Sequence, residues 1–134
     1  MSFFEIYGGK VSDLLNGKKK LQIQEDGNSK IQVSGLTERQ ASSEKEMNSI
    51  IDFGHSERTT HSTAANDTSS RSHAVCQIKV KDGSGKNIGK LLLVDLAGSE
   101  RAADTQSNNR QRRMEGAEIN KSLLALKECI RAID

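Results

Sequence analysis

The stretch Leu91–Glu100, with the sequence LLLVDLAGSE, limits most strongly what this chain can fold into. Its apolar run is too short for a confident helix and is typical of a strand buried on both faces of a parallel sheet. Asp95 follows at the carboxyl end of that strand, where ligands of open α/β sheets bind. Asp95 could hold a hydrated Mg²⁺, and the Gly98 amide could approach a phosphate without a Cβ in the way. Taken alone, this D-x-x-G pattern fits a simple capped turn better.

A second polar loop favours a functional site over a simple capped turn. Glu57–Ser72 contains two alanines as its only apolar bulk, and a polar stretch of that length inside a compact domain is usually functional or disordered. Alternation from Ala74 to Val80 then predicts a strand, and Asp82–Gly85 predicts a turn that leads into the first strand described above. The two polar loops therefore flank neighbouring, hairpin-linked strands, which favours a nucleotide site.

Composition places few limits on the partner. The 134 residues suffice for one domain with a modest core, and 20 basic against 18 acidic side chains give a net charge of +2. This balance indicates neither a nucleic-acid partner nor a membrane partner, so a charged partner must be met by a local patch. Cys76 and Cys129 have no neighbours at metal-ligand spacing and predict reduced thiols. With no membrane-spanning run and no signal-peptide pattern, we expect a soluble intracellular domain.

The first half of the chain predicts strands followed by a helix. Ser2–Tyr7 is typical of a core strand that starts almost at the first residue, which suggests that a preceding part is missing. Two alternating runs around Asp26-Gly27, at 21–24 and 31–34, predict a hairpin. Ser42 or Ser43 would cap the next helix. Four residues of that helix then follow helical spacing: Met47, Ile50, Ile51 and Gly54.

A long helix is expected from about Met114 to Ile133. Five apolar residues fall on one stripe of it: Ile119, Leu123, Leu126, Ile130 and Ile133. The other face carries the charged residues Lys121, Lys127, Glu128 and Arg131. Without further information, those charges are best explained as an ordinary solvated face.

Two motifs resemble the switch loops of the kinesin motor family. They are Asn66-x-x-Ser69-Ser70-Arg71-Ser72-His73 and Asp95-Leu96-Ala97-Gly98-Ser99-Glu100. Ser2–Tyr7 and Asn120–Leu126 also resemble kinesin segments in the right order, so the resemblance covers the whole chain. It implies an α/β fold: a fragment of a three-layer kinesin-type P-loop NTPase motor domain with a central mixed, largely parallel sheet.

Finer features resemble one kinesin class. Phe4–Val11, Glu115–Glu118 and Lys127–Arg131 are similar to the kinesin-thirteen class, whose internal motors depolymerise microtubule ends. Transport kinesins usually have Gly-Asn-Val where this chain has Lys127-Glu128-Cys129. The class resemblance implies filament-end disassembly by the parent protein.

The kinesin resemblance implies that ATP and Mg²⁺ are the cofactors. Ser70 would place its hydroxyl on the Mg²⁺, and Asp95 would hold the ion through water. The Gly98 amide would bond the γ-phosphate, and Asn66 would support the first loop near the phosphates. These four residues form the implied nucleotide and metal set.

The same resemblance implies three catalytic residues. Ser69 would help position the attacking water, and an ion pair between Arg71 and Glu100 would close the two loops over the nucleotide. We expect Arg71 and Glu100 at the same edge of the sheet, because their loops leave neighbouring strands. His73, at a strand start, is interpreted as a structural hydrogen-bonding residue.

The resemblance places the long helix against the microtubule. Lys121, Lys127 and Arg131 would be rim charges that speed encounter with acidic tubulin. Glu128 and Cys129 fit simple attraction less well and are assigned to shape or orientation at a curved protofilament end. The implied partner is tubulin, with no nucleic acid or membrane, and the implied location is the cytoplasmic microtubule cytoskeleton.

One family motif does not occur in this sequence. The phosphate-cradling loop G-x-x-x-x-G-K-[ST] is absent from the 134 residues, which we interpret as under half of a motor domain, cut at both ends. The leading function is that of the parent, microtubule-stimulated ATP hydrolysis coupled to end disassembly. The alternatives are a non-catalytic microtubule-binding or regulatory fragment, and an incomplete gene model. The isolated chain is expected to hydrolyse ATP negligibly.

Overall fold

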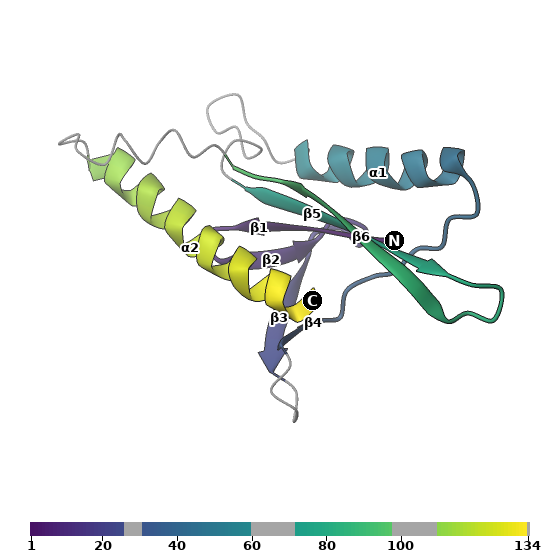
Figure 1. Cartoon of the computed structure of the whole chain (residues 1–134). Helices are drawn as coiled ribbons and strands as arrows, with labels where there is room; N and C mark the ends of the chain where they lie inside the picture. The colour runs from purple at the N-terminus through teal and green to yellow at the C-terminus, as the bar shows by residue number, and fades with distance from the viewer. Residues whose placement is uncertain (26–30, 60–71, 98–109, 134) are drawn as a thin grey trace.

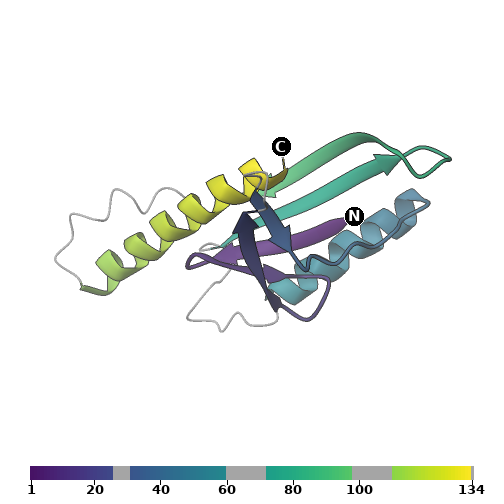
Figure 2. The same cartoon turned by 90° about the horizontal axis from the view of Figure 1, so that it is seen from below.

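The computed structural model describes residues 1–25, 31–59, 72–97 and 110–133. In these ranges one six-stranded sheet carries a helix on each face (Figures 1 and 2). The strands are β1 (Ser2–Tyr7), β2 (Lys10–Asp13), β3 (Lys19–Glu25), β4 (Ile31–Ser34), β5 (His73–Lys81) and β6 (Asn87–Asp95). The helices are α1 (Glu44–Thr59) and α2 (Arg110–Ile133). The predicted layers, helix on sheet on helix, agree with this arrangement.

The sheet order is β4-β3-β2-β1-β5-β6, and every neighbouring pair is antiparallel. The prediction of a largely parallel sheet is therefore wrong for the described part of the chain. The physical reason lies in the connections, since tight turns can join antiparallel strands, whereas parallel strands need a long crossover. Gly8-Gly9 joins β1 to β2, and residues 82–86 join β5 to β6.

Strand β6 is an edge strand among the described residues, so the prediction of a strand buried on both faces is also wrong. Its only described partner is β5, and Leu91, Leu93 and Val94 are 52%, 45% and 41% exposed. Leu92 does pack against the core. A run of apolar residues indicates that both faces of a strand are hydrophobic. It does not show which element, if any, covers each face.

The core consists of two clusters separated by the sheet. In β1, Phe4 and Ile6 are fully buried on the side of α2, beside Leu126 and Cys129. Phe3 points to the other face and packs in a cluster with Ile50 of α1. The period-2 alternation of a strand therefore supplies both clusters from consecutive residues of β1.

Helix α1 begins with a capping arrangement. The Oγ of Ser43 accepts the Glu46 N–H at 3.3 Å, and the Glu46 carboxylate accepts the Ser42 N–H at 2.6 Å. These bonds satisfy two backbone donors at the start of the helix. Of the two caps that were predicted, the structure selects Ser43.

Helix α2 starts four residues before the predicted Met114 and buries a different stripe. Ser122, Leu126 and Cys129 are buried, whereas Leu123 and Ile130 are 44% and 41% exposed. The side chains of Ile119 and Ile133 lie outside the described residues. Helical spacing allows several neighbouring stripes, and packing on β1, β2 and β4 decides among them.

Gly54 of α1 lies against the ring of Phe3. An added Cβ would stand 2.0 Å from Cδ1 and 2.6 Å from Cε1 of that ring, which also meets His55 edge-on. We expect Gly54→Ala to lower the free energy of unfolding by about 1–3 kcal/mol, because overpacking outweighs the gain in helix propensity. Urea denaturation measures the free energy of unfolding. Gly83→Ala, where an added Cβ meets nothing within 4 Å, is the control; equal losses in both variants would contradict the packing argument.

Candidate functional site

The two polar loops attach to one end of the β5–β6 hairpin, because the first precedes β5 and the second follows β6. Ala74, the second residue of β5, is the register partner of Asp95, the last residue of β6. Residues 60–71 therefore lead into the same sheet end that residues 98–109 leave. The prediction that the two loops flank neighbouring strands is therefore confirmed, because β5 and β6 pair at the ends where the loops attach.

Asp95 is the one predicted nucleotide-site residue within the described ranges. Its carboxylate is 64% exposed, and Oδ2 accepts a hydrogen bond from Arg58 Nη1 at 2.5 Å. The other predicted residues of the two loops lie outside the described residues: Asn66, Ser69, Ser70, Arg71, Gly98 and Glu100. The Arg71–Glu100 pair therefore stays a prediction.

Arg58 is a site residue that sequence reasoning missed. It lies in the last turn of α1, is 3% exposed, and contacts both loop attachments. Its Nε donates to Ser72 Oγ at 3.2 Å and its Nη2 to the Ser72 carbonyl at 2.8 Å, while Nη1 reaches Asp95. The available signal in the sequence was a basic residue close to the end of the predicted helix, at the start of the polar stretch Glu57–Ser72.

His73 makes a second link between the loop attachments. Its Nδ1 accepts the Ala97 N–H at 3.0 Å, which places the ring proton on Nε2. Within the described part of the chain, the buried Nε2–H has no partner. Burial, and then the Arg58 charge, lower the pKa of His73, whereas Asp95 acts in the opposite direction. The predicted structural hydrogen bond of His73 is confirmed.

We expect folding stability to fall as the pH drops below about 6.5, the ordinary histidine pKa. His73 is neutral in the folded state with a lowered pKa, so below that pH the unfolded chain binds more protons and is favoured. Protonation also turns Nδ1 into a donor that faces the Ala97 N–H. Urea midpoints between pH 7.5 and 5 measure the effect. His73→Asn, which can retain an acceptor near Nδ1, should show a flatter profile; identical profiles would contradict the assignment.

The described residues fit part of a Mg²⁺–nucleotide site. The exposed Asp95 carboxylate is a hard oxygen ligand, and no described residue donates to its Oδ1. The unpartnered Nε2–H of His73 suits an oxygen acceptor. Among the described residues, no cluster of three or more His, Cys, Asp or Glu side chains could hold a metal. One carboxylate with waters and phosphates is, however, the usual environment of Mg²⁺.

The predicted partner-facing residues of α2 separate into two groups. Lys121, Lys127 and Arg131 are exposed, and Glu128 pairs with Arg131 at 3.5 Å. Cys129 is fully buried beside Phe4, and burial raises the pKa of its thiol to about 11. A direct surface role for Cys129 is therefore incompatible with the structure. Its thiol faces the sheet, where it packs as a small apolar group.

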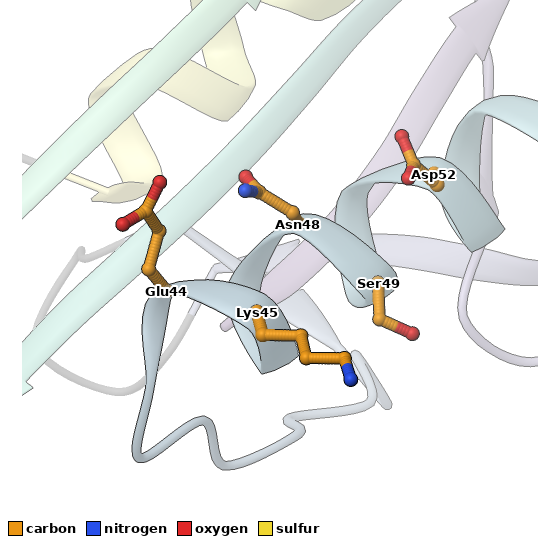
Figure 3. A pocket seen from close by; sticks show the side chains of 5 residues that line it. All are labelled: Glu44, Lys45, Asn48, Ser49 and Asp52. Atoms are coloured by element: carbon orange, nitrogen blue, oxygen red, sulfur yellow. The ribbon is translucent and has the colours of Figure 1, made fainter.

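A hollow on α1 lies apart from this site. The side chains lining it in Figure 3 are Glu44, Lys45, Asn48, Ser49 and Asp52. All are exposed residues of the first three turns, whereas Arg58 is in the last. The hollow is a surface groove of one helix, and we assign it no role. Neither described helix has an apolar stretch long enough to cross a membrane.

The chain is similar to known proteins in both sequence and structure. A family model described as the kinesin motor domain matches residues 1–134. Diatom spindle kinesin-1 from Cylindrotheca fusiformis is 54% identical over 133 residues, which cover 99% of this chain and 21% of that protein.

Two solved structures are also similar. A KIF14 dimer with AMP-PNP on a microtubule is 39% identical with a TM-score of 0.62, over 93% of this chain and 38% of that chain. A fast kinesin is 38% identical with a TM-score of 0.68, over 93% of this chain and 36% of that chain. The chain therefore spans about a fifth of the curated relative and over a third of each solved chain.

Proposed function

Because this chain belongs to the kinesin motor domain family, we propose that it forms the nucleotide-sensing and filament-facing part of a microtubule motor ATPase. The observation that carries the proposal is that hydrogen bonds link the residues at which the two loops attach to the sheet. Arg58 links Ser72 to Asp95, and His73 links β5 to Ala97. Two loops whose attachment points are linked in this way can respond together to a single ligand.

Asp95 and Ser70 would hold Mg²⁺, the former through water, and Gly98 and Asn66 would contact the nucleotide. When bound, Mg–ATP supplies the phosphoryl group and the cation that neutralises its charge. Oδ1 of the exposed Asp95 carboxylate would orient a water of the hydrated ion, while Oδ2 accepts a hydrogen bond from Arg58. Nucleotide binding is supported by the AMP-PNP named for the KIF14 structure.

The hydrolytic step is assigned to the two loops. Ser69 would position the attacking water, and Arg71 with Glu100 would close the loops and exclude bulk solvent. The support is the motif resemblance together with the shared attachment of both loops at one sheet end.

The partner is assigned to the exposed face of α2. Lys121, Lys127 and Arg131 form a basic rim suited to an acidic protein surface, with an effect that salt weakens. Tubulin is the proposed partner, and the microtubule cytoskeleton of the cytoplasm is the proposed location. The microtubule in the KIF14 structure and the spindle in the name of the diatom relative support both.

We further propose that the parent protein disassembles microtubule ends, as the kinesin-thirteen resemblance implies. Lys127 and Glu128, which depart from the transport-kinesin pattern, lie on the side of α2 away from the core. A basic and an acidic side chain side by side can recognise shape and orientation as well as charge.

The test uses a chimeric motor in which residues 1–134 replace the matching segment of the diatom spindle kinesin. We expect ATP hydrolysis that microtubules stimulate. Replacing Lys127 and Glu128 together by alanine, with buried Cys129 retained, should abolish end disassembly and leave basal ATPase intact. Glu44 and Lys45, an exposed pair on α1, are the matched control.

Each outcome tests a different part of the proposal. Unchanged disassembly in the Lys127/Glu128 variant would return the chain to the generic motor assignment. Microtubule binding without any ATP turnover would favour the alternative, a non-catalytic binding segment.

A further inference from the structure

We infer that Lys18 is a positioning residue of the candidate site, because it holds the carboxyl end of α1, from which residues 60–71 continue. The inference rests on the proposed function and adds a residue outside both loop motifs. The Lys18 ammonium donates to the Arg58 carbonyl at 3.4 Å and forms an ion pair with Glu5 of β1 at 3.2 Å. One side chain from the β2–β3 turn thus joins an interior strand of the sheet to the last turn of α1.

The helix end that Lys18 contacts is next to the candidate site. The Arg58 carbonyl is one of the last four of α1, which have no partner inside the helix. A cation there supplies a hydrogen bond and is favoured by the helix dipole. The side chain of the same residue contacts Ser72 and Asp95, where the two loops attach to the sheet. A shift of this helix end would therefore displace the start of the first loop and the contacts between the loop attachments.

Lys18 adopts a backbone conformation that lysine rarely takes. Its φ is +56°, and among the described residues it is the only non-glycine with a positive φ. In this left-handed region a Cβ lies too close to the following carbonyl, so glycine is favoured. The Lys18 N–H donates to the Asp13 carbonyl at 2.9 Å, which helps to hold the turn in this conformation. A strained lysine at a position that suits glycine indicates that its side chain has a role.

The ion pair is also costly to bury. The side chains of Lys18 and Glu5 are 14% and 6% exposed. Taking both charges out of water offsets much of their attraction, and apolar residues often stabilise a fold equally well at such positions. Glu5 Oε2 is buried as well, and within the described part of the chain it has no hydrogen-bond partner. Stability alone therefore gives little reason for this pair, whereas holding the end of α1 at a fixed place on the sheet does.

Hydrogen exchange in the 134-residue chain tests whether Lys18 holds the helix end. We expect Lys18→Met to speed exchange of the backbone amides in the last turn of α1 by about 10-fold or more, and to leave the middle of α1 unchanged. Lys19→Met is the matched control, because it removes the same charge from the exposed neighbour of Lys18. Equal last-turn exchange in the two variants would overturn the inference.

A double variant separates the loss of the contact from a loss of folding. Lys18→Met alone leaves the Glu5 carboxylate buried without its partner, which is strongly destabilising. Glu5→Gln combined with Lys18→Met removes both charges at similar side-chain volume, so its unfolding midpoint should stay close to that of the wild type. It also lacks the bond to the Arg58 carbonyl. Its last turn should therefore exchange about 10-fold faster as well, and wild-type exchange would overturn the inference.

The chimeric motor tests whether the contact matters for function. The double variant should lower kcat and kcat/KM for ATP together, by about 5- to 20-fold per folded molecule, because a displaced loop attachment costs most in the transition state. Lys19→Met should change neither by more than about twofold. Wild-type kcat in the double variant would overturn the positioning role, even if the end of α1 exchanges faster. If the unaltered chimeric motor has no ATPase, the proposed function fails, and the exchange rates still decide whether Lys18 holds the helix.

Discussion

Replacing Asp95 by asparagine in the chimeric motor is expected to lower microtubule-stimulated kcat by about 100-fold or more. The amide keeps the shape of the side chain but removes the charge that would hold hydrated Mg²⁺. It also removes the anionic partner of Arg58, whose side chain is 3% exposed. Steady-state ATPase assays over a range of Mg²⁺ concentrations measure the loss, and excess Mg²⁺ should restore only part of it.

Asp52→Asn is the matched control for this result. Asp52 is an exposed aspartate of α1, in the hollow that we assign no role. We expect its ATPase to stay within twofold of the wild type. An Asp95→Asn motor with normal kcat and normal Mg²⁺ dependence would remove Asp95 from the site.

Replacing Asp13 by alanine is expected to lower the free energy of unfolding by about 2–6 kcal/mol, from two unsatisfied donors at about 1–3 kcal/mol each. The fully buried Asp13 carboxylate accepts the Leu15 N–H at 2.9 Å and the Thr37 N–H at 2.8 Å. The bond from Thr37 holds the end of β2 to the segment before α1, and the bond from Leu15 fixes the turn that follows β2. Because a domain is stable by about 5–15 kcal/mol, the variant should lose much of its folded population. Urea denaturation followed by circular dichroism measures the change.

Asp82→Ala provides the comparison. The Asp82 carboxylate accepts similar backbone bonds, from Ser84 and Lys86, but it sits in the exposed β5–β6 turn, where water can replace them. Its unfolding midpoint should stay close to that of the wild type. Similar losses in the Asp13 and Asp82 variants would show that burial is not the cause.

Several elements could be predicted because their signals are local. The core strand β1, the hairpin of β3 and β4, and the serine cap of α1 depend on residues within a few positions of each other. The structure confirms each of these. The structural hydrogen bond of His73 was also predicted, from its place at a strand start, although its partner Ala97 lies 24 positions away in the sequence.

The candidate site was only partly predictable. Asp95 follows directly from its place at the end of a strand, and the motif resemblance added the roles of the two loops. Arg58 could not be assigned, because its three contacts join residues 14 and 37 positions away in the sequence. Cys129 was misplaced for a related reason, since helical spacing alone does not say which stripe of α2 meets the sheet.

The sequence by itself determined where strands and helices form, which loops are polar, and the kinesin family. These properties depend on short-range periodicity, capping and motifs, which are written along the chain. Tertiary structure alone decided the antiparallel order of the sheet, the exposed edge of β6, the buried stripe of α2 and the Arg58–Asp95 pair. Each of these depends on which surfaces meet in space, and the burial of a side chain is a property of its neighbours as well as of its own chemistry.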